Sequence, residues 1–168
     1  MAIPAAAALA LAGCQVAKET ESLLFAVGPA VEARLAGSNG TTVTGAAMLK
    51  SYDGGVLMTV NFNGAGPGEY RVVIHANGNC TSRNAFSAGA PWLPPGQPGP
   101  VPAPTLHKND DSASLVARLP GYRIEGPDGI MGRAVVVHAG AQGSLEAQPG
   151  VPNNRIACGV IGPPRPTF

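Results

Sequence analysis

The strongest constraint on the fold of this chain is a series of short extended segments separated by turn-forming residues. Residues 31–35 and 56–62 alternate apolar and polar side chains with a period of two, which is typical of half-buried strands. Turn signals rich in asparagine, aspartate and glycine lie between them, at residues 38–40 and 52–55. After the N-terminal residues, no long stretch has the period of an amphipathic helix. The pattern predicts an all-β antiparallel sandwich or barrel rather than an α/β enzyme.

Further extended segments are predicted along the rest of the chain, at residues 41–49, 70–75, 112–119, 133–139 and 155–161. The length of 168 residues allows one domain with a core, and hardly two. The formal net charge is only +1, and no basic run or cluster of aromatic and basic residues is present. The sequence therefore gives no indication of a nucleic-acid surface, and we expect no nucleic-acid partner.

Residues 90–104 differ in composition from the rest, because prolines recur throughout them. Proline cannot donate a backbone hydrogen bond and fixes its own φ, so this segment predicts an irregular loop. The loop is either a stiff surface connection between strands or a polyproline ligand for a partner domain.

The N-terminus has the composition of an export signal. Residues 1–13 are apolar and rich in alanine, and they lead into Leu11-Ala12-Gly13-Cys14, which resembles the lipobox of bacterial lipoproteins. In that family the signal peptide is cleaved before the cysteine, whose sulfur then carries a diacylglycerol. The chain departs from the usual pattern because no Lys or Arg precedes the apolar run. An ordinary secretory signal and a buried alanine-rich helix are the alternatives, whereas the run is too short for a good transmembrane span.

These features predict three parts, namely a signal peptide at residues 1–13, a tether at 14–29 and a folded domain at 30–168. Lipidation of Cys14 would make the membrane a partner through a lipid anchor. Gln15 follows that cysteine, and in the lipoprotein family this favours sorting to the outer membrane. We therefore expect a lipid-anchored protein of the periplasm and cell envelope.

Apart from Cys14, the chain contains two cysteines, Cys80 and Cys158. In an exported protein, two cysteines far apart in sequence most simply form one disulfide bond. Closing a loop of this size would stabilise the fold by about 4–5 kcal/mol in the chain-entropy treatment. Two unpaired buried thiols are the alternative.

Three separated segments resemble the copper/zinc superoxide dismutase family. Residues 66–80 end in Val-Val-Ile-His-Ala-Asn-Gly-Asn-Cys, which is close to the family pattern His-x-His-x-x-Gly-x-Cys, in which both histidines bind copper. Residues 132–141 resemble the strand that carries another copper histidine. Residues 154–162 resemble the C-terminal strand with the disulfide cysteine and the active-site arginine. The order and spacing of the three segments agree with the family between residues 30 and 162.

The resemblance implies an eight-stranded Greek-key β-barrel or flattened sandwich, immunoglobulin-like in architecture, with Cys80 paired to Cys158. It also implies which metal ligands remain. The four copper-histidine positions of the family correspond here to Val73, His75, Pro91 and His138. Two histidines therefore remain for copper, and the family's copper site is incomplete.

A zinc site of the family's kind is not expected. That site needs three histidines and an aspartate, and beyond the proline-rich loop the chain offers only His107. In the family, zinc also orders the loop after the bridging histidine. We expect the prolines of residues 90–104 to take over this ordering, because proline reduces the conformational entropy of the unfolded chain.

Arg155 corresponds to the family's active-site arginine, which attracts the superoxide anion. Its role here is either anion guidance or hydrogen bonding to nearby backbone carbonyls that anchors the last loop, since a guanidinium offers five donors. Without a metal, the cationic side chain could still bind a small anion.

Valine and proline cannot coordinate a metal through their side chains, whereas dismutation needs enough imidazoles to hold both Cu(II) and Cu(I). We therefore expect an envelope lipoprotein whose superoxide dismutase-like domain is catalytically impaired or inactive and serves as a binding or structural module. One alternative is a periplasmic copper-binding or copper-transfer protein that uses His75 and His138. Another is a residual Cu-only superoxide dismutase in which His107 or Met131 completes the copper sphere.

Overall fold

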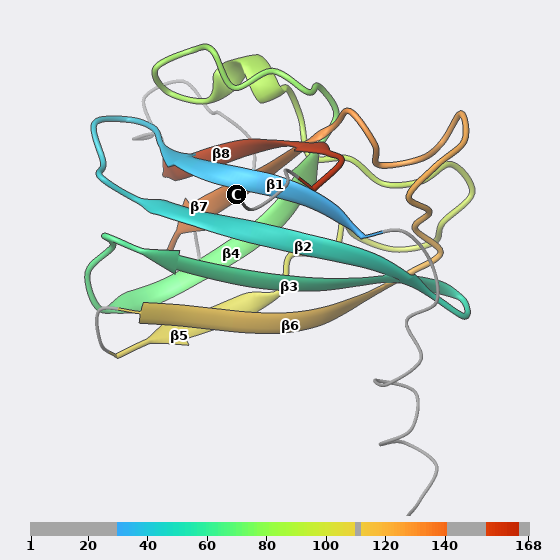
Figure 1. Ribbon diagram of the computed structural model, residues 1–168, viewed down its shortest axis with the longest axis horizontal. Helices are drawn as coiled ribbons and strands as arrows, with labels where there is room; N and C mark the ends of the chain where they lie inside the picture. Colours follow the sequence, from blue (N-terminus) through green and yellow to red (C-terminus); the bar gives the residue numbers. More distant parts are fainter. Residues whose placement is uncertain (1–29, 110–111, 141–153, 165–168) are drawn as a thin grey trace, which may run out of the picture.

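The computed structural model describes residues 30–109, 112–140 and 154–164. Eight strands form in this part of the chain (Figure 1): β1 (Val31–Gly37), β2 (Thr44–Tyr52), β3 (Gly55–Asn63), β4 (Gly68–His75), β5 (Thr105–Lys108), β6 (Ser112–Pro120), β7 (Ala134–Ala139) and β8 (Arg155–Gly162). A short 3₁₀ helix, η2 (Phe86–Ala88), lies between β4 and β5.

All seven segments predicted from the residue pattern overlap strands of the structure. The eighth strand, β5, was not predicted from that pattern, because it has only four residues and follows the proline-rich loop directly. His107 therefore lies in a strand rather than in a loop.

The strands form one antiparallel sheet in the order β5-β4-β7-β8-β1-β2-β3-β6. The two end strands, β5 and β6, approach each other, so the sheet curls into a nearly closed barrel. Consecutive strands β3 and β4 are not paired, because β3 pairs with β6 whereas β4 pairs with β5 and β7. The connection at residues 64–67 therefore runs from β3, in the front layer of Figure 1, to β4, in the back layer. This confirms the predicted all-β Greek-key barrel.

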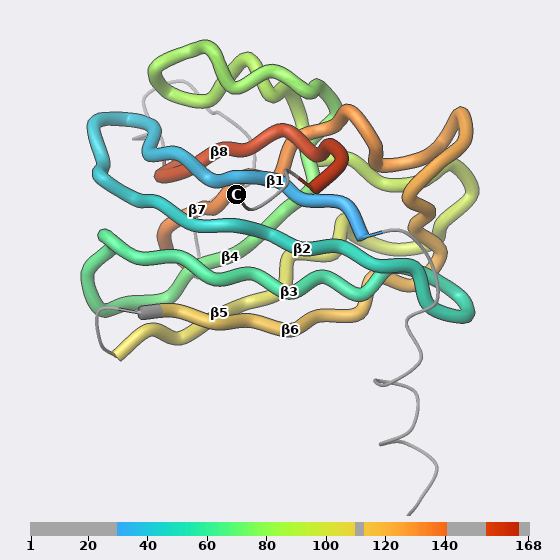
Figure 2. The backbone as a smooth tube through the Cα atoms, viewed as in Figure 1, coloured from blue at the N-terminus to red at the C-terminus, as the bar shows by residue number. Residues whose placement is uncertain are grey.

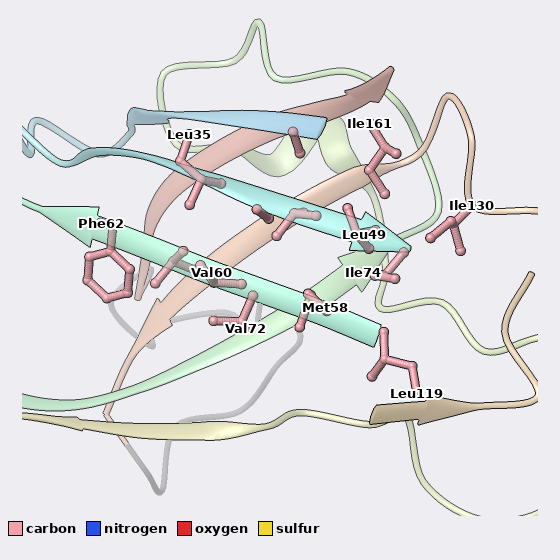
Figure 3. Packing of buried hydrophobic residues seen from close by; sticks show 14 of the residues in the cluster. Leu35, Leu49, Met58, Val60, Phe62, Val72, Ile74, Leu119, Ile130 and Ile161 are labelled. Atoms are coloured by element: carbon pink, nitrogen blue, oxygen red, sulfur yellow. The ribbon is translucent and has the colours of Figure 1, made fainter. Parts of the chain in front are cut away.

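The interior of the barrel is filled by alternate residues of the strands (Figure 3). In β3 the inward residues Val56, Met58, Val60 and Phe62 are at most 1% exposed, and a polar residue such as Asn61 points outward. Each fully buried side chain of this kind stabilises the fold by about 1.5–3 kcal/mol. The alternation in sequence therefore reports directly which face of β3 meets the core.

Two strands, β4 and β7, are buried on both faces, as their nearly continuous apolar runs suggest. In β7, Val135 and Val137 enter the barrel core, whereas Ala134 and Val136 face a second apolar cluster outside it. That cluster is completed by residues of the 76–91 segment and by the disulfide. The segment between β4 and β5 therefore covers the outer face of β7 and β8.

The segment between β4 and β5 forms the long excursion coloured light green to yellow in Figure 2. Residues 92–104 contain no strand or helix, as predicted. The two ends of this stretch are fixed to β4, since Trp92 N–H donates to the Ile74 carbonyl and Val72 N–H donates to the Pro104 carbonyl. These bonds favour the interpretation of a stiff surface connection.

The predicted signal peptide (1–13), the tether (14–29) and the lipidation residue Cys14 lie outside the described residues. Within the described ranges, the structure contains no helix long and apolar enough to cross a membrane.

Candidate metal centre

The structure brings His75 and His138 together on the outer face of the barrel, beneath the segment that follows β4. Their Nε2 atoms lie 3.0 Å apart, and both side chains are fully buried. The two ring planes differ by 19°. The ring centroids lie 5.2 Å apart, which is the Nε2–Nε2 distance plus about one ring radius for each imidazole. The two imidazoles are therefore nearly coplanar and point at each other head to head.

Strand register explains how two histidines from different strands meet. In the ladder between β4 and β7, His75 pairs with Ala134, and His138 pairs with Arg71 four residues further along. Between them on this face lies the pair Val73 and Val136. The histidine side chains reach toward each other from opposite ends of this apolar floor.

The other ring nitrogen of each histidine is fixed by an oxygen acceptor. His75 Nδ1 donates to the Gly89 carbonyl at 2.8 Å, and His138 Nδ1 lies 3.0 Å from Asn154 Oδ1. Because a carbonyl oxygen only accepts, both rings carry their proton on Nδ1 when neutral. Metal-bound histidines commonly show the same arrangement, with the non-ligating N–H donated to a carbonyl or carboxylate.

The electrostatic environment keeps both rings neutral at ordinary pH. Burial, together with the positive charge of Arg155, lowers the pKa of His75 to about 4, against the opposing hydrogen bond to Gly89. Burial likewise lowers the pKa of His138 to about 4, opposed by the hydrogen bond to Asn154 and assisted by the charge of Arg155. Two Nε2 lone pairs consequently face each other across 3.0 Å, and a single cation between them would relieve their repulsion.

A β-bulge places Arg155 beside the histidines. The ladder between β7 and β8 pairs Val137 with Ala157 but His138 with Arg155, so Ile156 is the extra residue. Without this extra residue, Arg155 would point to the opposite face, because side chains alternate along a strand. The carbonyl of the bulged residue Ile156 is satisfied by the backbone N–H of Ser38.

The Arg155 guanidinium is 4% exposed and binds the segment that covers the site. Its Nη1 donates to the Ala85 carbonyl at 2.9 Å, and its Nη2 donates to the Gly89 carbonyl at 3.0 Å. These are backbone hydrogen bonds of the kind expected under the anchoring interpretation of Arg155. The role of this residue in guiding or binding an anion stays a prediction. The Gly89 carbonyl accepts from both Arg155 and His75, and so connects the two side chains.

The disulfide predicted between Cys80 and Cys158 is present, with Cα atoms 5.7 Å apart and a sequence separation of 78. It ties β8 to the segment that carries Ala85 and Gly89. The acceptors of Arg155 are therefore held to the strand from which Arg155 projects.

Val73 and Pro91, the residues predicted to stand at the remaining family ligand positions, have side chains that cannot bind a metal. Val73 is fully buried in β4, and Pro91 forms an isolated bridge with His75 through the backbone. His107 is exposed and pairs with Glu69 near the start of β4, and it forms no metal-holding group with His75 and His138. Met131 is 39% exposed on a turn. Among the described residues, no group of three or more His, Cys, Asp or Glu side chains could hold a metal ion.

Comparison with known proteins decides the family. A sequence model described as copper/zinc superoxide dismutase (SODC) matches residues 43–161. The chain belongs to the copper/zinc superoxide dismutase family. A solved structure titled as the clock protein EA4 is similar to this superoxide dismutase-family domain, with a TM-score of 0.62 and 25% sequence identity. The alignment covers 79% of this chain and 93% of that chain.

The metals implied by the superoxide dismutase family differ in how well they fit these residues. Structural zinc sites need four nitrogen, oxygen or sulfur ligands, and the described residues supply no such set. Among the described residues, no third metal-binding side chain joins His75 and His138. Two buried, neutral imidazoles with bare Nε2 atoms and fixed Nδ1 atoms do fit a cation that accepts few ligands, such as Cu(I).

Sequence reasoning found the two histidines and the arginine but missed the groups that orient them, Gly89 and Asn154. Gly89 acts through its backbone carbonyl, which no side-chain motif reports. Asn154 lies directly before the bulged strand, and the sequence alone does not show that its side chain reaches His138.

Proposed function

We propose that this superoxide dismutase-family domain has lost the family's dismutation and instead binds one Cu(I) ion, as an exported copper-binding or copper-transfer protein. One observation carries the proposal, namely the head-to-head arrangement of His75 and His138 with both Nε2 lone pairs directed at the same point. Imidazole is a suitable copper ligand, and two imidazoles can hold Cu(I) at low coordination. The lowered pKa values support this proposal, because few protons compete for the nitrogens near pH 7.

Dismutation in the family's manner is disfavoured by the missing ligands. The reaction alternates Cu(II) and Cu(I), and the oxidised ion prefers more nitrogen ligands than two. Val73 and Pro91 stand where two of the four histidines would be, and both are fixed in place, the first by the core and the second by its bridge to His75. The incomplete site therefore supports an impaired or inactive enzyme.

In this proposal the ion is cargo, which His75 and His138 bind directly. Gly89 and Asn154 orient the two rings, and Arg155 holds the covering segment in place. The Nε2 atoms must move apart from 3.0 Å, because two metal–nitrogen bonds of about 2 Å each do not fit that distance in line. Uptake and release thus require a small opening of the pair.

The proposed location is the periplasmic side of the cell envelope, with a lipid anchor on Cys14. The lipobox-like residues 11–14 and the disulfide Cys80–Cys158 support it, since disulfides persist in oxidising compartments. Metabolic labelling with a fatty-acid analogue tests the anchor. We expect the label on the wild-type protein and none on Cys14→Ser, and an unlabelled wild-type protein would rule out lipidation.

Competition for Cu(I) against a chromogenic chelator under anaerobic conditions tests the copper proposal, using the disulfide-bonded domain. We expect one site with sub-micromolar affinity that is lost in both His75→Ala and His138→Ala. His107→Ala is the matched control, because this histidine is exposed and lies at the other end of β4.

The same preparation distinguishes the rival functions. A dismutase assay on the copper-loaded protein should give no activity above free copper in the same buffer, and substantial activity would favour a Cu-only dismutase instead. If Cu(I) binds no better to wild type than to the double histidine variant, the domain is a metal-free binding or structural module.

A further inference from the structure

The side chain of Asn154 contacts the histidine pair from the C-terminal side. Its Oδ1 lies 3.0 Å from His138 Nδ1, and its Nδ2 donates to the Ala139 carbonyl at 3.1 Å. The backbone adds a third bond, since Ala139 N–H donates to the Asn154 carbonyl at 2.8 Å. Asn154 is therefore attached by both main chain and side chain to the end of β7, where His138 lies.

The bond to Ala139 determines which way the amide points. If the Asn154 amide were flipped, its oxygen would face the Ala139 carbonyl oxygen, and two acceptors would meet. In the orientation found, the amide nitrogen donates to Ala139 and the amide oxygen is left for His138. His138 must then donate from Nδ1, which leaves its Nε2 without a proton.

The tautomer of His138 determines whether the two Nε2 atoms repel each other or form a hydrogen bond. With both protons on Nδ1, the two Nε2 lone pairs oppose each other at 3.0 Å. With the His138 proton on Nε2 instead, the neutral rings would form an ordinary N–H···N hydrogen bond at that distance. That bond would satisfy both Nε2 atoms, at the cost of two acceptors meeting at His138 Nδ1 and Asn154 Oδ1, and it would have to break before a metal could bind.

We propose that Asn154 is a positioning residue that holds His138 as the Nδ1–H tautomer, and thereby keeps His75 and His138 as an open two-nitrogen receptor for a monovalent metal ion. The inference rests on the proposed Cu(I)-binding function. Asn154 differs from the corresponding group at His75, because the Gly89 carbonyl belongs to the backbone and is retained in every variant. Of the two acceptors, the Asn154 side chain is the one that a substitution can remove.

Two variants test the role of Asn154. Asn154→Leu removes the acceptor at similar volume, and we expect a loss of Cu(I) affinity of about 10–100-fold, the range found when an outer partner of a ligating histidine is removed. Asn154→Asp loses the donor to the Ala139 carbonyl but keeps an oxygen acceptor for His138, and we expect affinity within a few-fold of wild type. Asn61→Leu and Asn61→Asp are the matched controls, because Asn61 is exposed on β3.

The second readout is the tautomer itself, measured from ring ¹⁵N chemical shifts in the metal-free protein. We expect His138 as Nδ1–H in wild type and in Asn154→Asp, and as Nε2–H in Asn154→Leu. This readout needs neither copper nor activity. A merely structural role of Asn154 would change the melting temperature without moving the proton.

The outcomes separate the two levels of the argument. A wild-type His138 protonated on Nε2 overturns the positioning role, as does an Asn154→Leu protein that keeps both the Nδ1–H tautomer and the wild-type affinity. If the tautomer shifts as expected while wild type binds no Cu(I), the positioning role is supported and the copper function fails.

Discussion

Gly89 presents a backbone carbonyl to the site and adopts backbone angles that residues with a side chain rarely take. Its carbonyl accepts hydrogen bonds from His75 and Arg155. The backbone angles, φ 77° and ψ −155°, lie in a region that is almost exclusive to glycine. A Cβ at this position would lie 2.7 Å from Asn77 Nδ2, which itself donates to the Ser87 carbonyl. The residue is therefore constrained by conformation, by crowding and by the carbonyl it presents.

We predict that Gly89→Ala lowers the free energy of unfolding by about 1–3 kcal/mol through backbone strain, with a further loss from displacing Asn77. Cu(I) affinity should fall as well, because the acceptor of His75 moves. Urea denaturation and chelator competition measure the two effects. Gly96→Ala is the matched control, since Gly96 has φ 76° with no atom within 4 Å of the added Cβ. Equal losses in the two variants would contradict the prediction.

The sequence predicted the site at the level of side-chain identity but not at the level of orientation. His75, His138 and Arg155 were found because they stand in family motifs. The acceptors Gly89 and Asn154 were not found, because the first acts through its backbone and the second becomes a neighbour of His138 only through the turn of the chain into β8. The orientation of the two imidazole rings depends on contacts in three dimensions that a sequence motif does not specify.

Among the elements, the proline-rich loop is held at its start by an aromatic cluster. The Arg133 guanidinium lies 3.7 Å over the Trp92 ring and donates to the Ala76 carbonyl at 3.0 Å. The Tyr122 ring packs edge-on against Trp92, and its hydroxyl donates to the Trp92 carbonyl at 2.9 Å. A guanidinium thus fixes this loop at its start, where the resemblance to the family implied ordering by zinc.

We predict that the stability of this domain does not depend on zinc. Incubation with EDTA should leave the melting temperature unchanged, and added zinc should not raise it. Arg133→Gln should lower the free energy of unfolding by about 1–3 kcal/mol, through loss of the cation–π contact and of hydrogen bonds to two carbonyls. Arg118→Gln on β6 is the control. A fall in melting temperature on chelation would show that zinc contributes to the fold.

The buried Tyr122 hydroxyl should make stability depend on alkaline pH. Burial raises the pKa of Tyr122 to about 12, from 10.0 in an unfolded chain. Between these values the unfolded state loses the phenolic proton while the folded state keeps it, so stability falls as pH rises from 10 to 12. The contribution lost is up to about 2–3 kcal/mol.

Comparison with Tyr122→Phe isolates this effect from other alkaline titrations. The variant lacks the ionisable group, so the stability advantage of wild type over Tyr122→Phe should shrink between pH 10 and 12. Denaturation curves at a series of pH values measure it. A constant difference between the two proteins would argue against a buried, neutral hydroxyl.

At this scale the sequence predicted the longer strands and missed the shortest one. The alternation in residues 56–62 predicted a half-buried strand, which is confirmed in β3. The four residues of β5 are too few to show a period. The bulge at Ile156 could not be predicted either, because it depends on pairing with β7 rather than on β8 alone.

For the whole molecule, the disulfide connects the covering segment to the barrel. Cys80 lies at the start of the segment that carries Ala85 and Gly89, and Cys158 lies in β8 three residues after Arg155. The apolar cluster of Ala85 and its neighbours consists mostly of small side chains. The bridge is therefore expected to be the main restraint that keeps the cover on the histidine pair.

The double variant Cys80→Ser/Cys158→Ser tests this restraint. We predict a loss of about 4–5 kcal/mol in the free energy of unfolding, because the bridge closes a loop with a sequence separation of 78. Cu(I) affinity should fall too, because Gly89 and Arg155 are then less firmly held around His75. Serine is preferable to chemical reduction, since free thiolates would themselves bind Cu(I). Unchanged affinity in a destabilised variant would mean that the pair is organised by the strands alone, and the cover would then have no part in holding the ion.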